Sequence, residues 1–133
     1  MVDRQGIPLA IRVTGANQHD SVVFEALIDA IPPSKRPWGR PRHRPEKLHA
    51  DKAYDSRRCR QALHRRKIKV RIARKGVERS ERLGRHRWVV ERTLAWLSRF
   101  RRLTVRYERR CAIHDAFLHL GCALICLNYL DRF

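Results

Sequence analysis

Apolar and polar residues alternate in two short segments of the chain. Residues 7–15, IPLAIRVTG, carry apolar side chains at every second position, and residues 68–72, IKVRI, repeat the pattern. A period of two is typical of a strand with one buried face. The short run 48–50 just before Asp51 predicts a further strand.

Helical segments follow these strands. Cap residues and apolar spacing predict four helices: one over 22–31 after the N-cap run His19-Asp20-Ser21, one from Asp55-Ser56 to about Arg66, one from between Glu81 and Arg85 to about Leu103, and one over about Ala112 to Tyr129. Interleaved strands and helices favour an α/β fold, with helices flanking a mixed sheet.

The third of these helices has a broad apolar face. That face comprises Trp88, Val89, Val90, Thr93, Leu94, Trp96, Leu97, Phe100 and Leu103, and it is predicted to face the core. Arg87, Glu91, Ser98 and Arg102 cluster on the other side, so Glu91 should point to solvent. An ordinary surface pair between Glu91 and Arg87, four residues apart, explains Glu91 equally well on this helix alone.

Residues 32–47 form a basic loop. They contain five of the six prolines and six basic residues, which excludes regular structure. Trp38 in this loop either stacks on a nucleic-acid base or anchors the loop, and anchoring is the expectation. A second charged loop is predicted over 74–80, around Gly76.

Charge points to the class of partner. The 133 residues suit one domain and carry a net charge of +18. Residues 1–31 and 111–133 are slightly acidic, so the excess lies between them, and 25 of the 31 basic residues are arginine. Arginine binds phosphate through a planar fork, which favours nucleic acid over a membrane surface. The apolar run 120–130 is too short to span a bilayer and no secretory leader precedes it, so a cytoplasmic location is expected.

Four cysteines, Cys59, Cys111, Cys122 and Cys126, include no Cys-x-x-Cys pair. Neither a zinc ribbon nor a redox motif is indicated. His119 could share a helical face with Cys122 and Cys126 as metal ligands. Their apolar neighbours favour the interpretation that the cysteines are core thiols.

Two carboxylates occupy positions suited to chemistry. Asp51 leaves the carboxyl end of a short strand, where α/β sheets gather ligands, and Glu91 lies on the outer face of a later helix. Each has a simple structural explanation, a turn residue and a surface acid. Together, they could hold Mg²⁺ for metal-assisted phosphoryl transfer on DNA bound by the basic surface.

Three segments carry a family resemblance: LHADKAYDS at 48–56, IARKG at 72–76 and GRHRWVVERTLAWLSRFRRLTVRYERR at 84–110. They resemble bacterial insertion-sequence transposases of the DDE type, in the group called transposase class four, family five. The resemblance covers nearly the whole chain. It implies an RNase H-like catalytic domain in which three acids bind two divalent metals, Mg²⁺ or Mn²⁺, to cut and rejoin double-stranded DNA at element ends and target.

Carried over by residue, Asp51 matches the second acid of the family and Glu91 its glutamate. The 39 residues between them leave no room for the large insertion domain of some relatives. Arg87 and Glu91 keep two positions of the family's tyrosine, arginine, glutamate and lysine signature. Gly84 replaces the tyrosine, and Ser98, next to Arg99, replaces the lysine. DNA contacts are expected from basic residues near the acids: Arg87, Arg99, Arg102, Lys52, Arg74 and Lys75.

The first acid of the family has no counterpart here. Its position precedes the segment VDRQGIPLA, and neither Asp3 nor Asp20, which caps the following helix, matches it. Residues 1–133 are therefore expected to form the C-terminal portion of a catalytic domain, without its first strand. We expect it to be inactive without an upstream half and to form homo-oligomers in the active complex. The alternatives are a non-catalytic basic DNA-binding protein that regulates transposition, and a remnant without a role; only catalysis needs both Asp51 and Glu91.

Overall fold

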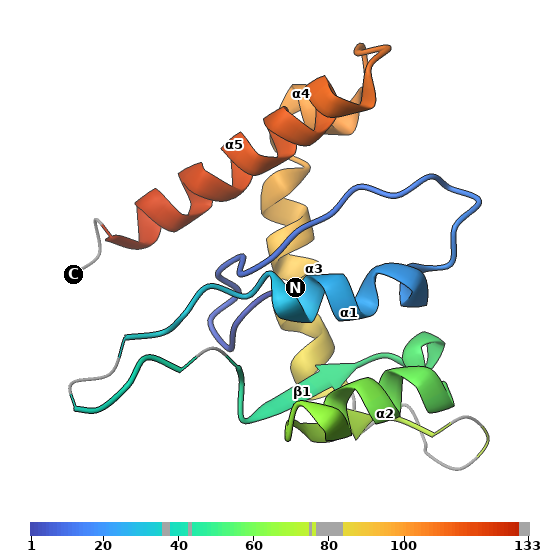
Figure 1. Ribbon diagram of the computed structural model, residues 1–133. Coiled ribbons are helices and arrows are strands. Elements are labelled where there is room, and N and C mark those ends of the chain that lie inside the picture. The colour runs from blue at the N-terminus through green and yellow to red at the C-terminus, as the bar shows by residue number, and fades with distance from the viewer. Residues whose placement is uncertain (36–37, 43, 75, 77–83, 131–133) are drawn as a thin grey trace. The chain divides into compact units, whose positions relative to one another are not determined.

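The computed structural model describes residues 1–35, 38–42, 44–74, 76 and 84–130, the last with side chains from residue 88 onward. Figure 1 follows the chain from its N-terminus to its C-terminus. The residues fall into two compact units. One comprises Met1–Val13 with Arg87–Phe133, and the other comprises Thr14–His86.

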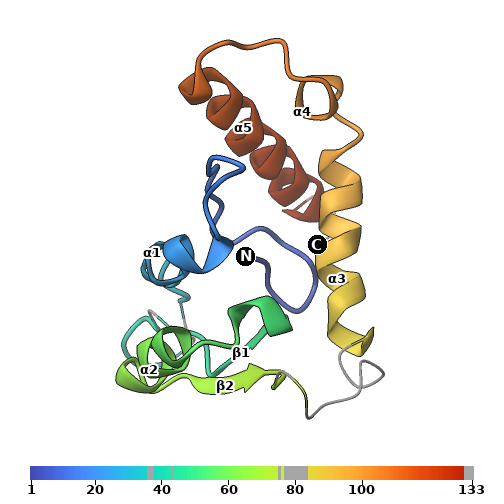
Figure 2. The ribbon, with the colours of Figure 1, turned by 90° about the vertical axis from the view of Figure 1, so that its right-hand side faces the viewer.

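The unit of Thr14–His86 is a small α/β structure. Its elements in chain order are a 3-10 helix η1 (Asp20–Val23), α1 (Phe24–Asp29), β1 (Lys47–Ala50), a second 3-10 helix η2 (Lys52–Tyr54), α2 (Arg57–Arg65) and β2 (Lys69–Ile72). The two strands are parallel, and their register pairs Lys47 with Lys69 and Ala50 with Ile72. Figure 2 shows α2 beside this sheet. The strand, helix and strand predicted over residues 48–72 are confirmed.

Local signals explain this β-α-β segment. The Ser56 hydroxyl accepts a hydrogen bond from the Cys59 backbone N–H at 3.2 Å, as an N-cap side chain does. Helix α2 buries residues three and four apart, Cys59, Ala62 and Leu63. They join Phe24, Ile28, Leu48, Ile68, Ile72 and Ala73 in the core of this unit.

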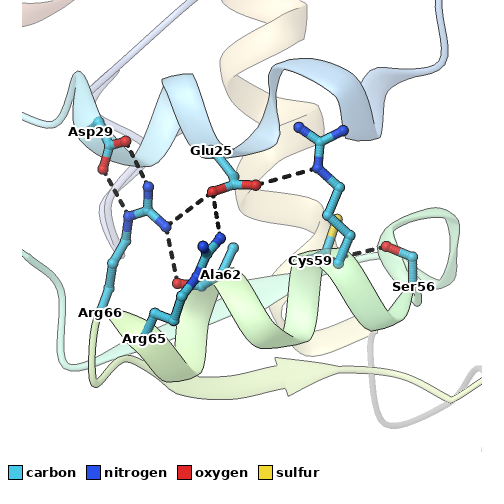
Figure 3. Close-up of polar contacts among 8 residues, drawn as sticks. Glu25, Asp29, Ser56, Cys59, Ala62, Arg65 and Arg66 are labelled. Carbon is cyan, nitrogen blue, oxygen red and sulfur yellow. Dashed lines mark hydrogen bonds and ion pairs between the residues drawn. The ribbon is translucent and has the colours of Figure 1, made fainter.

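A cluster of ion pairs connects α1 to α2 and its C-terminal cap residue Arg66 (Figure 3). Glu25 accepts from Arg58 at 3.3 Å and from Arg65 at 3.0 Å, and Arg66 bridges Glu25 and Asp29 at 3.3 and 2.7 Å. The hydrogen bond from Arg58 is the main reason that the pKa of Glu25 lies below its usual value. The hydrogen bond from Arg66 likewise lowers the pKa of Asp29. The network keeps two short helices paired.

The other unit is helical. It contains most of α3 (Gly84–Leu97), together with α4 (Arg101–Thr104) and α5 (Cys111–Leu130). Leu97, Cys122 and Ile125 form the centre of its core, with Ile11, Trp96, Phe100, Leu103, Leu118 and Tyr129 packed around them. Gly121 permits a close approach, because a Cβ there would lie 3.1 Å from a Leu103 methyl and 3.2 Å from a Leu97 methyl.

The strand predicted over residues 7–15 does not form. The segment makes only an isolated antiparallel bridge between Val2 and Pro8. The N–H groups of Leu9 and Ala10 donate to the Met1 carbonyl, and the Met1 amine donates to the Ala10 carbonyl at 2.7 Å. The alternation of apolar and polar residues in this segment therefore reflects its partial burial alone. A strand also needs a continuous series of backbone hydrogen bonds to a neighbouring strand, and Pro8 has no N–H to donate to it.

The helix predicted to reach Leu103 is interrupted. α3 ends at Leu97, and α4 begins at Arg101 after a turn. The Thr104 hydroxyl donates to the Ser98 carbonyl across that turn. The buried face is also narrower than predicted, because Trp88, Val90 and Leu94 are 50%, 46% and 59% exposed. Val89, Thr93 and Leu97 are buried.

The remaining helices follow prediction more closely. The His19 side chain caps η1 by accepting from the Ser21 N–H. The side chain of Asp20, predicted to cap this helix, lies outside the described residues. Cys59 and Cys122 are core thiols, and burial raises the pKa of the Cys122 thiol, but Cys111 is exposed at the first turn of α5. Its predicted burial is wrong because it begins a helix, where few neighbours cover it.

Helix α5 is longer than the apolar run 120–130 alone indicates. Among the residues that the structure describes, it is the one helix that meets length and composition criteria for crossing a membrane, with a mean hydropathy of 1.4. Core helices of soluble proteins meet the same criteria, but those helices are mostly buried, whereas 17% of the apolar window of α5 is buried. Gly121, Cys122 and Ile125 of α5 are buried against the rest of its unit.

Candidate metal-binding acids and nucleic-acid interface

Asp51 lies at the carboxyl end of β1. Its carboxylate accepts the Lys52 backbone N–H at 2.6 Å and caps η2, and the side chain is exposed. The register of β1 and β2 places the carboxyl ends of both strands at this edge, with Arg74 following β2. A carboxylate at the carboxyl edge of parallel strands is well placed for a ligand.

An ion pair near Asp51 stabilises this edge of the sheet, and the sequence analysis did not predict it. Arg60 of α2 binds the Asp55 carboxylate at 2.7 Å and donates to the Ile72 carbonyl at 3.0 Å. Both side chains are largely buried, 27% and 17% exposed. Arg60 thus connects the end of β2 with the turn that follows η2. The only sequence signal was the five-residue spacing of two opposite charges.

Glu91 lies on α3, and its side chain is exposed, as helical periodicity predicts. The helix is held within its unit on the other side. The buried Thr93 hydroxyl donates to the Gly6 carbonyl at 2.7 Å. Arg92 donates to the Gln5 carbonyl, and its guanidinium lies 4.5 Å from the centroid of the Trp88 ring and 4.9 Å from that of Trp96. The helix that carries Glu91 is therefore fixed by the N-terminal segment.

The two acids belong to different units, Asp51 to Thr14–His86 and Glu91 to the helical unit. Within the described parts of the chain, no three His, Cys, Asp or Glu side chains gather into a group that could hold a metal ion. Their approach to one metal therefore remains a prediction.

The predicted DNA-contacting residues differ in their surroundings. Arg74 and Arg99 are exposed, and Lys52 is half-buried. The side chains of Arg87 and Lys75 lie outside the described residues. Arg102 is engaged by the protein: it pairs with Glu108 at 2.9 Å, and its guanidinium lies 5.4 Å from the Tyr107 ring centroid.

Residues 99–110, which we call the arginine turn, join α3 and α5 through α4. Six arginines here are exposed: Arg99, Arg101, Arg102, Arg106, Arg109 and Arg110. The one acid of the turn, Glu108, has a side chain only 6% exposed. Burial opposes ionisation of Glu108, but backbone N–H groups and Arg102 outweigh it and lower its pKa. The exposed charges of the turn are thus all positive, which suits an interface with a polyanion.

Comparisons with known proteins identify the class. Residues 1–128 match the family model described as "Transposase DDE domain". The chain therefore belongs to the DDE transposase family, and the resemblance seen in its motifs is confirmed.

The chain is also similar to an individual transposase over nearly its whole length. The chain is 52% identical, over 132 residues, to a protein named as a candidate transposase for insertion sequence element IS402 of Burkholderia cepacia. The match covers 99% of this chain but 63% of the relative, so the chain spans less than two thirds of that protein's length. No solved structure matches the chain significantly.

Proposed function

We propose that these residues form part of an insertion-sequence transposase that cuts and rejoins DNA with the help of divalent metal ions. The observation that carries the proposal is the exposed Asp51 carboxylate at the carboxyl edge of β1 and β2, within a chain that matches the DDE family. Asp51 and Glu91 would be two of three metal-binding acids. The fold of the complete domain would be RNase H-like.

The chemistry of Asp51 and Glu91 suits Mg²⁺ or Mn²⁺. Both offer carboxylate oxygens, the hard ligands that Mg²⁺ prefers, and both are exposed. Two such ions, when bound, would activate the attacking oxygen and stabilise the leaving one. The backbone N–H of Lys52 holds one Asp51 oxygen, which fixes the direction of the carboxylate. The Arg60–Asp55 pair would keep that edge in place.

Substrate binding would rest on charge. The arginine turn, Arg74 and Lys52 would contact phosphates of double-stranded DNA at element ends and target, in the cytoplasm. Because neither Asp3 nor Asp20 matches the first acid, that acid would come from a further segment, such as an upstream half. Asp3 already accepts the N–H groups of Gln5 and Ile7 at 2.8 Å, which gives it a turn-forming role. The active complex would be a homo-oligomer.

Iron-mediated backbone cleavage tests the shared metal site without relying on transposition. Fe²⁺ with ascorbate and peroxide, bound in place of Mg²⁺, generates radicals that cut the polypeptide near the metal. We expect cuts near both Asp51 and Glu91 in the intact 133-residue chain, suppressed by Mg²⁺. Asp51→Asn or Glu91→Gln should abolish both cuts, because each acid would hold the same ion.

Two matched acids serve as controls. Glu46 is exposed at the opposite end of β1, and Asp115 lies on α5 beside His119 at 3.4 Å. Glu46→Gln and Asp115→Asn should leave both cuts intact. Cuts near only one of the two sites would refute a shared metal. DNA binding without specific cuts at either site would favour the alternative, a non-catalytic regulator.

A further inference from the structure

Trp38 is exposed in a way that its loop does not explain. Its side chain is 90% exposed, the highest value among the large hydrophobic residues that the structure describes. The expectation that it anchors the basic loop is wrong, because an anchor must be buried against the body of the protein. An exposed large apolar side chain more often marks a contact site.

Two backbone hydrogen bonds close the base of the loop that carries Trp38. The N–H of Ser34 donates to the Arg42 carbonyl at 2.8 Å, and the N–H of Arg42 donates to the Ser34 carbonyl at 2.9 Å. Between them, Gly39 adopts a φ of +93°, which glycine accommodates readily. A Cβ at Gly39 would meet no described atom within 4 Å. Trp38 therefore lies next to the left-handed Gly39, between the paired residues Ser34 and Arg42.

The charges around Trp38 identify the partner. Residues 30–45 contain five lysines and arginines and no acid. Arg44 donates to the Arg66 carbonyl at 2.8 Å and closes against α2, whereas Arg40 next to the turn is exposed. An exposed indole two residues from an exposed arginine suits a ligand that combines an aromatic face with a negative charge. Nucleotides combine both, and bases stack on aromatic side chains regardless of sequence.

We propose that Trp38 stacks on an unpaired base of the DNA substrate while Arg40 contacts the adjacent phosphate. The proposal rests on the DNA-binding part of the proposed function. Both faces of a base inside a duplex are already covered by its neighbours, so the indole needs a base that has left the stack. Trp38 would thus favour DNA with an unstacked nucleotide over intact duplex.

The test compares two DNA probes of equal charge and length by fluorescence anisotropy. One is a fully paired duplex, and the other is the same duplex with one mispaired, unstacked thymine. The intact chain should bind the mispaired probe more tightly, by roughly tenfold for one stacked base. Trp38→Ala should lose this preference while keeping its affinity for the paired duplex. All variants should share the thermal stability of the parent, because the indole is exposed.

Two further variants separate stacking from other apolar contact. Trp38→Phe keeps an aromatic face and should keep most of the preference. Trp38→Leu keeps apolar bulk without an aromatic face and should lose it. A preference that persists in Trp38→Leu or Trp38→Ala would overturn the proposal, as would an equal loss on both probes. Failure of the parent chain to bind either probe would instead refute the DNA binding on which the proposal rests.

Discussion

The buried hydroxyl of Thr93 gives a sharp stability prediction. Thr93 is 3% exposed, and its hydroxyl lies 2.7 Å from the Gly6 carbonyl and 3.1 Å from the Val89 carbonyl. Gly6 is itself buried, so water cannot easily replace the donor. Thr93→Val keeps the shape of the side chain but removes the donor, which leaves the Gly6 carbonyl unsatisfied.

The expected loss is about 1–3 kcal/mol in the free energy of unfolding, the cost of a buried polar group without its partner. Urea denaturation followed by circular dichroism measures it. For a slope of about 1–2 kcal/mol per M, the midpoint should fall by roughly 1 M.

Thr104→Val is the matched control, because it makes the same chemical change at an exposed threonine. Thr104 also donates to backbone carbonyls, those of Ser98 and Phe100, but there water can take over. Its cost should stay within about 0.5 kcal/mol. Equal midpoints for Thr93→Val and Thr104→Val would refute the reasoning that the Gly6 contact fixes α3 to the N-terminal segment.

Three other predictions concern packing, acid sensitivity and charge. Gly121→Val should destabilise the helical unit by about 1–3 kcal/mol, since the new side chain meets the Leu103 and Leu97 methyls, and thermal unfolding measures this. Glu25 has a pKa below its usual 4.5, so its contribution to stability is present above that pH and is lost as the pH falls through the lowered value. The Glu25→Gln variant should therefore have a lower free energy of unfolding than the parent chain at neutral pH, and this free energy should fall less on acidification than that of the parent. The DNA affinity of the chain should fall by about 10³ to 10⁵ between roughly 50 and 200 mM salt for about six to ten phosphate contacts. Replacing Arg106 and Arg109 by glutamine should reduce the slope of log affinity against log salt concentration by about 0.9 for each phosphate that the protein no longer neutralises. A slope unchanged by those replacements would remove the arginine turn from the interface.

The β-α-β segment was predictable because its signals are local. Ser56 caps the helix that follows it, and alternation over 68–72 coincides with a real partner strand. The same alternation over 7–15 predicted a strand that does not form. This segment hydrogen-bonds to Met1 and packs against helices, and in the described part of the chain it has no second strand beside it. A strand depends on a neighbour that no local pattern reveals.

The candidate site was predictable in part for the same reason. Exposure of Glu91 follows from helical periodicity, and exposure of Asp51 follows from its place after a short strand. The pairing of Arg102 with the buried Glu108 depends on how the chain turns between α4 and α5, which spacing alone does not determine. The exposure of Trp38 likewise depends on the conformation of the loop that Ser34 and Arg42 close, which the local sequence pattern does not determine.

Strand cleavage by a complete transposase tests the central claim most directly. The chain would be co-expressed with an upstream half that supplies the first acid, and incubated with Mg²⁺ or Mn²⁺ and DNA that carries the matching element ends. We predict cleavage by the pair, none by the 133-residue chain alone, and loss of cleavage with retained DNA binding in Asp51→Asn and Glu91→Gln. Cleavage by the lone chain that Glu91→Gln abolishes would show that another residue completes the site. Undiminished cleavage in either variant of the pair would contradict the assignment of Asp51 and Glu91 as metal-binding acids.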